Sequence, residues 1–178
     1  MTSIRAKDFQ ERFFRRNPGL REPLQLMKAA PNASFFVKDT DCRYVLANAF
    51  HLSIYDLTRE EDLVGKAASD FFPGLLAQAY HANDRRVLES CVSIRNEVWL
   101  VPHIRGLPRW FLASKSPLFD LDGEILGLAR SDVHDQHAGA PTYSLPGTQS
   151  YFTKRFRKAT GMGPLAYRKY LRRNQGTD

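Results

Sequence analysis

The stretch Ser34-Phe-Phe-Val-Lys-Asp-Thr-Asp-Cys-Arg-Tyr-Val-Leu-Ala-Asn48 decides the fold. Its two ends, residues 34–39 and 43–48, are rich in the aromatic and β-branched residues that favour strands. The polar segment Asp39-Thr-Asp-Cys42 between them has the composition of a tight turn. The pattern therefore predicts a β-hairpin.

Strands and helices are also expected on the C-terminal side of this hairpin. Three further strands are expected at residues 92–101, 109–118 and 125–131. Asp120-Leu-Asp-Gly123 joins the last two as a hairpin turn, with glycine at the left-handed position. Thr58-x-x-Glu61 has the spacing of a capping box, which predicts a short helix closed by Gly65. Residues 75–90 are expected to form a longer helix. Its candidate inner residues are Leu76, Tyr80, Val87 and Leu88.

Residues 1–30 are expected to form an N-terminal helical cap. Two apolar stripes predict two short helices, separated by the helix-breaking Asn17-Pro18-Gly19. The stripes are Phe9, Phe13 and Phe14, then Leu20, Leu24 and Met27. Such helices either cover the sheet of their own domain or pair with a second chain.

The order of these elements, and several short motifs, resemble PAS domains over residues 31–133. The motifs are Phe35-Phe-Val-Lys-Asp39, Asn48, Leu63-Val-Gly-Lys66, Asp70-Phe-Phe-Pro73, Asp84-Arg-Arg-Val87, the strand of Trp110 and Asp122-Gly-Glu-Ile-Leu-Gly127. The resemblance implies an α+β fold, in which a five-stranded antiparallel sheet with helices on one face encloses a potential ligand cavity. It also implies a sensory or dimerisation role.

The cavity would be lined by inward-facing residues of the sheet and of the small helices. The candidates are Phe36, Tyr44, Leu46, Phe50, Tyr55, Phe72, Tyr80, Trp99, Trp110 and Leu112. The alternative interpretation is that these aromatic and aliphatic residues are ordinary hydrophobic core.

The net charge of the chain lies entirely in its last 28 residues. Residues 151–178 contain eight Lys and Arg residues against one acid, Asp178, whereas residues 1–150 sum to zero. A neutral body with a basic tail is typical of a protein that contacts polyanions. Gly161 and Pro164 have the positions expected where one helix ends and a second begins. The tail therefore predicts two short helices, at residues 150–159 and 164–173.

The tail resembles the second helix-turn-helix of AraC/XylS-type transcription regulators. The matching residues are Ser150-Tyr151-Phe152, Phe156, Arg157-Lys158, Thr160-Gly161, Pro164 and Tyr167-Arg168. The chain departs from that family at Gly163, and it lacks the first helix-turn-helix. Residues 134–149 are expected to be an irregular linker because glycine and proline interrupt every helical turn. Residues 150–178 are thus expected to be a partial helix-turn-helix.

The resemblance implies which residues of the tail would contact double-stranded DNA. Four would face bases: Gln149, Ser150, Thr153 and Lys154. Four would contact phosphates, which position a protein without specifying sequence: Arg155, Arg157, Lys158 and Arg168. Because only one unit is present, weak binding is expected.

Cofactors and metals are not expected. His81 falls where haem-binding PAS domains carry their ligand, but its neighbours are polar, and neither Cys42 nor Cys91 has the context of a flavin-reactive cysteine. His134, Asp135 and His137 are too few for a structural metal site. The sequence also lacks the common catalytic motifs, so no enzyme activity is expected.

The chain is expected to be cytoplasmic. It has no apolar run of 18 residues, its N-terminus lacks a signal-peptide core, and its two cysteines suit a reducing compartment. The overall prediction is a homodimeric transcription regulator with a PAS sensory domain. The alternative is a sensing or dimerisation module whose DNA-binding remnant does not function.

Overall fold

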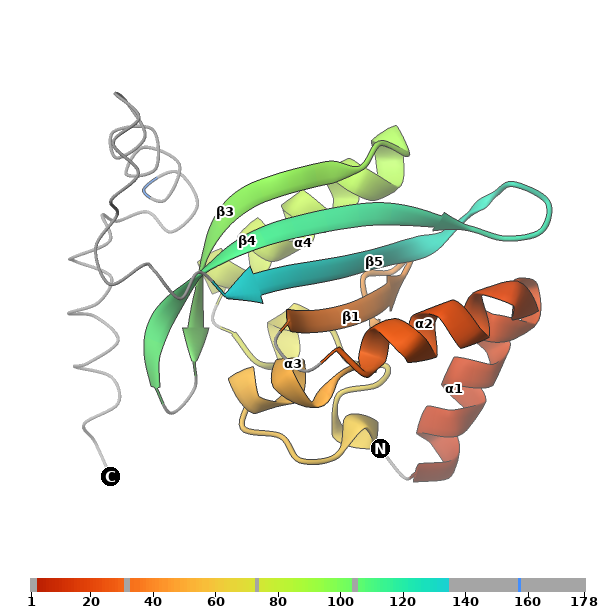
Figure 1. The fold of residues 1–178 in the computed structure, drawn as a ribbon, viewed down its shortest axis with the longest axis horizontal. Helices are drawn as coiled ribbons and strands as arrows, with labels where there is room; N and C mark the ends of the chain where they lie inside the picture. Colours follow the sequence, from red (N-terminus) through yellow and green to blue (C-terminus); the bar gives the residue numbers. More distant parts are fainter. Residues whose placement is uncertain (1–2, 31–32, 73, 104–105, 135–156, 158–178) are drawn as a thin grey trace.

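The computed structural model describes residues 3–30, 33–72, 74–103, 106–134 and 157. Their centre is a five-stranded antiparallel sheet in the order β2-β1-β5-β4-β3 (Figure 1). The strands are β1 (Ala33–Asp39), β2 (Tyr44–Ala47), β3 (Ile94–His103), β4 (Gly106–Phe119) and β5 (Ile125–His134). The expected α+β fold with a five-stranded antiparallel sheet is confirmed.

Two features predicted from the sequence fix the register of the sheet. β1 and β2 form the expected hairpin, and β4 and β5 form the second one, whose turn residue Gly123 has φ of 84°. Gly127 then lies where β5 meets β1, and a Cβ atom there would be 2.1 Å from the carbonyl oxygen of Lys38. Only glycine therefore fits at this close approach.

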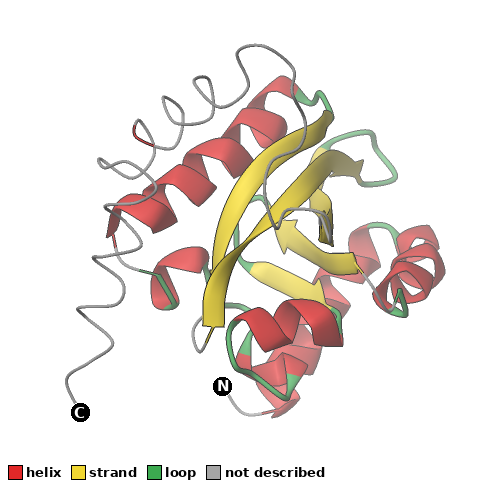
Figure 2. Cartoon of the chain, turned by 60° about the vertical axis from the view of Figure 1, so that its left-hand side comes forward, coloured by secondary structure: helices red, strands yellow, loops and turns green. Residues whose placement is uncertain are grey.

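Short helices and one long helix cover the inner face of the sheet. They are α3 (Ala49–Ile54), the 3-10 turns η2 (Glu60–Asp62) and η3 (Ala68–Asp70), and α4 (Gly74–Ser90). Figure 2 shows α4 running along the sheet. The main core lies between these helices and the sheet, and includes Leu52, Leu63, Val87, Phe111 and Leu128.

The predicted capping box at Thr58 is wrong. Arg59, not Thr58, precedes η2, and no side chain caps it. The segment closes as a single 3-10 turn, and Arg59 instead forms ion pairs with Glu61 and Asp62 at 2.9 Å. Gly65 does lie in the left-handed region after this segment, with φ of 78°.

The N-terminal helices cover the opposite face of the same sheet. They are α1 (Ser3–Arg16), η1 (Pro18–Leu20) and α2 (Arg21–Lys28). Phe13, Phe14 and Leu24 are buried in a second apolar cluster with strand residues such as Val37 and Leu126. In this structure the helices therefore cap their own chain, which is the first of the two interpretations left open by the sequence.

The predictions for the basic tail lie outside the described residues, apart from Arg157, which is helical and exposed. β5 extends to His134, so this first residue of the expected linker is part of a strand, and residues 135–149 lie outside the described part. No helix within the described ranges has the length and apolar character needed to cross a membrane.

Candidate functional site

A small cavity lies between the inner face of the sheet and helices α3 and α4. Its volume is about 20 Å³, which is room for about one water molecule. Its lining combines aromatic rings, aliphatic side chains, four charged groups and one imidazole. The lining residues are Phe36, Lys38, Tyr44, His51, Ile54, Tyr55, Phe72, Tyr80, Asp84, Val101, Arg130 and Asp132.

Five aromatic residues form one wall of this cavity. Tyr44 and Tyr55 are joined through their hydroxyl groups at 2.6 Å. The ring of Tyr55 lies 5.2 Å from that of Phe72, which lies 5.5 Å from the ring of Tyr80. Phe36 packs edge-on against Tyr44 at 5.2 Å. This wall is predominantly apolar, with tyrosine hydroxyls as polar handles.

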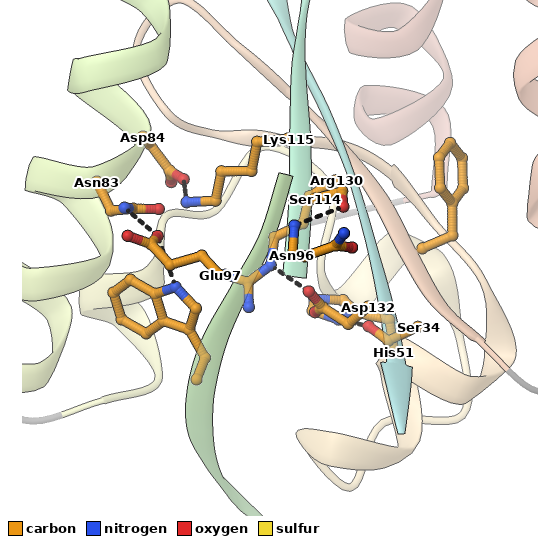
Figure 3. A network of polar contacts seen from close by, with 12 residues as sticks. Ser34, His51, Asn83, Asp84, Asn96, Glu97, Ser114, Lys115, Arg130 and Asp132 are labelled. Atoms are coloured by element: carbon orange, nitrogen blue, oxygen red, sulfur yellow. Dashed lines mark hydrogen bonds and ion pairs between the residues drawn. The ribbon is translucent and has the colours of Figure 1, made fainter. Parts of the chain in front are cut away.

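A buried ionic triad of Lys38, Asp84 and Lys115 crosses the interior beside the aromatic wall, and Figure 3 shows two of its members, Asp84 and Lys115. Asp84 on α4 accepts from Lys38 on β1 at 2.7 Å and from Lys115 on β4 at 2.5 Å. Each of the three side chains is at most 2% exposed. Burial alone would raise the pKa of Asp84, but attraction by both lysines outweighs it and holds that pKa below its usual range. Burial lowers the pKa of Lys115 to about 8, against the attraction of Asp84.

A second buried ion pair lies on β5. Arg130 Nε donates to Asp132 Oδ1 at 2.6 Å, and the two side chains are 5% and 3% exposed. Burial opposes the charge of Arg130, but attraction to Asp132 raises the pKa of Arg130, so the guanidinium is charged. Its cationic group also lies 5.6 Å from the centre of the Phe36 ring, within the range of a cation–π contact.

His51 on α3 brings a neutral imidazole to the same cavity. Its Nδ1 lies 2.9 Å from the hydroxyl of Ser34, whereas its buried Nε2 has no hydrogen-bond partner among the described residues. Burial, reinforced by Arg130 and Lys38, holds the pKa of His51 well below 6.5. Asn48 caps α3 and accepts from the backbone N–H of His51 at 2.9 Å, which fixes the ring at this position. A buried polar atom facing a cavity suits a bound polar molecule.

Half of the residues predicted from the sequence to line a pocket do line this cavity. They are Phe36, Tyr44, Tyr55, Phe72 and Tyr80. Phe50 and Trp99 pack against the inner core without lining the cavity, next to Phe111 and Tyr80 respectively. The side chain of Trp110 lies outside the described ones.

The predictions for Leu46 and Leu112 are wrong. Leu46 is buried in the second apolar cluster, under the N-terminal helices. The alternation of inward and outward side chains along β2 is interrupted there, because the pairing of β2 with β1 shifts register between Val37 and Lys38. Leu112 is 40% exposed on the outer face of the sheet. Side chains alternate along β4, and because Phe111 points into the core, its neighbour Leu112 points outward.

The polar half of the lining and two of its aliphatic residues are absent from the residues predicted from the sequence. The missed residues are Lys38, His51, Ile54, Asp84, Val101, Arg130 and Asp132. A signal was present for three of the charged ones, because they occupy positions that periodicity assigns to the inside. Lys38 follows Phe36 by two, Arg130 follows Leu128 by two, and Asp84 follows Tyr80 by four.

The histidine and cysteines considered as cofactor ligands lie outside this cavity. His81 is exposed on α4, Cys91 is exposed, and Cys42 is buried in the hairpin, where burial raises its pKa to about 11. The described residues contain no cluster of three side chains suited to a metal. An open groove of about 280 Å³ runs between α1 and η2, but its Arg59 and Glu60 are held in ion pairs with their neighbours.

Comparison with known proteins identifies the domain that carries the cavity. Residues 29–131 match the family model described as PAS fold. A diguanylate cyclase of Vibrio cholerae is 32% identical over 103 residues, which are 56% of this chain and 32% of that protein. The chain thus spans about a third of the cyclase.

Two solved structures extend the comparison. VqmA of Vibrio cholerae, in a complex with ligand and DNA, is 25% identical with a TM-score of 0.55, over 64% of this chain and 50% of that one. A phage VqmA in complex with DPO superposes over 90% of this chain and 89% of that one, with a TM-score of 0.57 and 15% identity. At 15% identity, the similarity to the phage protein shows a shared fold and nothing more.

Proposed function

Because the chain belongs to the PAS-fold family, we propose that it is a sensory protein that binds a small molecule in the cavity and regulates transcription. The observation that carries the sensory part is His51, which lines the cavity and whose buried Nε2 has no hydrogen-bond partner among the described residues. Buried polar atoms are normally satisfied, so this position fits the polar group of a ligand. We propose no catalytic role.

The cavity is too small for an organic ligand as it stands. About 20 Å³ holds one water molecule, so binding requires the lining side chains to move apart. The lining joins β1, β5, α3 and α4, and a ligand would therefore shift several elements together. Such a shift is what a sensor needs in order to report binding.

A DNA-binding role is supported by the charge distribution and by one relative. The seven net positive charges of residues 151–178 suit contact with phosphates. The VqmA structure named above contains DNA as well as ligand. We propose that eight residues of the tail contact double-stranded DNA: Gln149, Ser150, Thr153, Lys154, Arg155, Arg157, Lys158 and Arg168. We also propose that the PAS domain dimerises, so that two tails bind DNA together.

The DNA-binding role is tested by titrating the full chain against random and promoter duplexes at several salt concentrations. We expect weak binding that falls steeply with salt, and we expect both Lys154→Ala and Arg157→Ala to weaken it. Arg157→Ala should leave sequence preference unchanged, because a phosphate contact carries no sequence information. Absence of binding even at low salt would favour the alternative, a sensing or dimerisation module with a non-functional DNA-binding remnant.

The sensory role is tested separately with a cavity-filling variant. Ile54 is 4% exposed and lines the cavity, so Ile54→Phe should occupy the space of a ligand without removing a charge. Ile4→Phe adds the same ring at a position that is 73% exposed and serves as the matched control. Small molecules that raise the Tm of the wild type and of the control, but not of Ile54→Phe, would support the proposal.

A further inference from the structure

The buried charges around the cavity do not balance. Among the described residues that are classed as buried, the cationic side chains are Lys38, Lys115 and Arg130, and the carboxylates are Asp84 and Asp132. Three cations therefore face two anions. The imbalance is unusual because an uncompensated buried charge is costly.

The neighbouring titratable groups in the described part of the chain leave this surplus in place. Glu97 lies close to the triad, but it pairs with Arg86 at 3.1 Å, so the two cancel. His51 is held neutral and adds no charge. Burial raises the pKa of Asp132, and any protonation of that carboxyl would enlarge the positive surplus.

The surplus arises beside the cavity, because Lys115, which does not line it, shares the carboxylate of Asp84 with the lining residue Lys38. Asp84 uses one oxygen for Lys38 and the other for Lys115, so one carboxylate serves two cations. Lys38 and Arg130 both line the cavity from neighbouring strands, and β1 pairs Phe36 with Arg130. His51 lines the same cavity, and its buried Nε2 has no hydrogen-bond partner in the described part of the chain. The cavity lining therefore carries two cations and two carboxylates beside an apolar aromatic wall, and the surplus cation is Lys115, which does not line the cavity but shares Asp84 with Lys38.

From this arrangement we infer that the ligand is a small organic monoanion, whose charged group lies between Lys38 and Arg130 and whose apolar part packs on the aromatic wall. This inference rests on the proposed sensory function and specifies the chemical class of the ligand. One negative charge would match the surplus of one positive charge. A neutral molecule of the same shape would leave the surplus uncompensated.

The test compares matched pairs of small molecules at pH 7 and constant ionic strength. Formate, acetate and benzoate are each titrated against their neutral amides, formamide, acetamide and benzamide. Binding to the full chain is followed by calorimetry and by the shift in Tm. For at least one pair, we expect the carboxylate to bind about tenfold or more tighter than its amide, because close charges in a buried site interact strongly.

Lys115→Met supplies the decisive variant. In this variant two buried cations, Lys38 and Arg130, pair with two carboxylates, Asp84 and Asp132, so the positive surplus disappears. Asp84 still has Lys38 as its partner. The preference for carboxylate over amide should fall to near unity. Lys7→Met removes an equal charge from an exposed position of α1 and should retain the preference.

The outcomes separate this inference from the sensory proposal. Amides that bind as tightly as carboxylates, and that fail to bind Ile54→Phe, would overturn the inference and leave the sensory function standing. A carboxylate preference that survives in Lys115→Met would also overturn it. If the carboxylates, the amides and all other small molecules tested leave the Tm of the folded wild type unchanged, both the sensory function and the monoanionic ligand are rejected.

Discussion

Lys38 and Asp84, 46 positions apart in the chain, form an ion pair of 2.7 Å in which the side chains are 2% and 1% exposed. The pair ties β1 to α4 across the interior, and Lys115 joins it from β4. Charged groups at such depth are stable only when each has its partner. The interior of this domain is therefore built around a polar network as well as an apolar core.

Loss of the shared carboxylate should strongly destabilise the protein. Asp84→Asn leaves Lys38 and Lys115 buried without a charged partner, and we expect the free energy of unfolding to fall by about 3–5 kcal/mol in urea titrations. Glu89→Gln on the same helix breaks an exposed pair with Arg85 and should cost less than about 1 kcal/mol. Equal effects of the two substitutions would contradict the buried network.

Acid should destabilise the protein through His51. Its pKa is lowered in the folded state, mainly by burial, so below pH 6.5 the unfolded chain binds a proton that the folded chain does not. The free energy of unfolding should therefore decrease as the pH falls below 6.5, by up to about 1.4 kcal/mol per pH unit. His51→Gln should lose this slope between pH 6.5 and 5, and the exposed control His81→Gln should keep it. Urea titrations at pH 7, 6 and 5 measure both, and an unchanged slope in His51→Gln would refute the assignment.

The close approach of β5 to β1 should not tolerate a side chain. In Gly127→Ala the new methyl group would meet the carbonyl oxygen of Lys38, which is backbone and cannot move aside alone. We expect a loss of roughly 1–3 kcal/mol or more in thermal or urea unfolding. Gly74→Ala, at the exposed start of α4, has no atom within 4 Å of the added Cβ and should be neutral or slightly stabilising. A neutral Gly127→Ala would show that the two strands pair differently.

The two cysteines should differ in reactivity. Cys91 is exposed, whereas Cys42 is buried and burial raises its pKa to about 11, which disfavours the reactive thiolate. A disulfide reagent at pH 8 should therefore modify one thiol rapidly in the folded protein and the second only on unfolding. Cys91→Ser should remove the fast reaction. Rapid modification of that variant would mean that the hairpin is open.

Much of the fold could be predicted from local sequence patterns. The two hairpins follow from strand-forming residues around turn residues, and the turn at Gly123 is as expected. The long helix follows from its apolar spacing, and α4 begins one residue before the expected start at Leu75. The predicted capping box does not form: the 3-10 turn begins after Arg59, one residue later than expected, and the carboxylate of Glu61 pairs with Arg59.

The aromatic half of the candidate site was predictable, but the polar half was not identified. Phe36 on β1 and Tyr44 on β2 are strand aromatics of the kind that indicate an inner face. The side to which each β4 residue points depends on the pairing of β4 with β5, and the prediction places Leu112 on the wrong side. The spacing of Asp84 from Tyr80 places it on the inner face of the helix, but only tertiary contacts show that two lysines pair with it. Partners that lie 31 and 46 positions away leave no local signal.

The most direct test of the sensory proposal is native mass spectrometry of the full chain after incubation with a small-molecule extract of the expressing cells. We predict a bound mass of a small molecule on the wild type and on Ile4→Phe, and its loss from Ile54→Phe, whose added ring fills the cavity. The folded state of each variant is checked by circular dichroism. A bound mass retained equally by Ile54→Phe, or none on the wild type at any extract concentration, would contradict the proposal that this cavity is the sensory site.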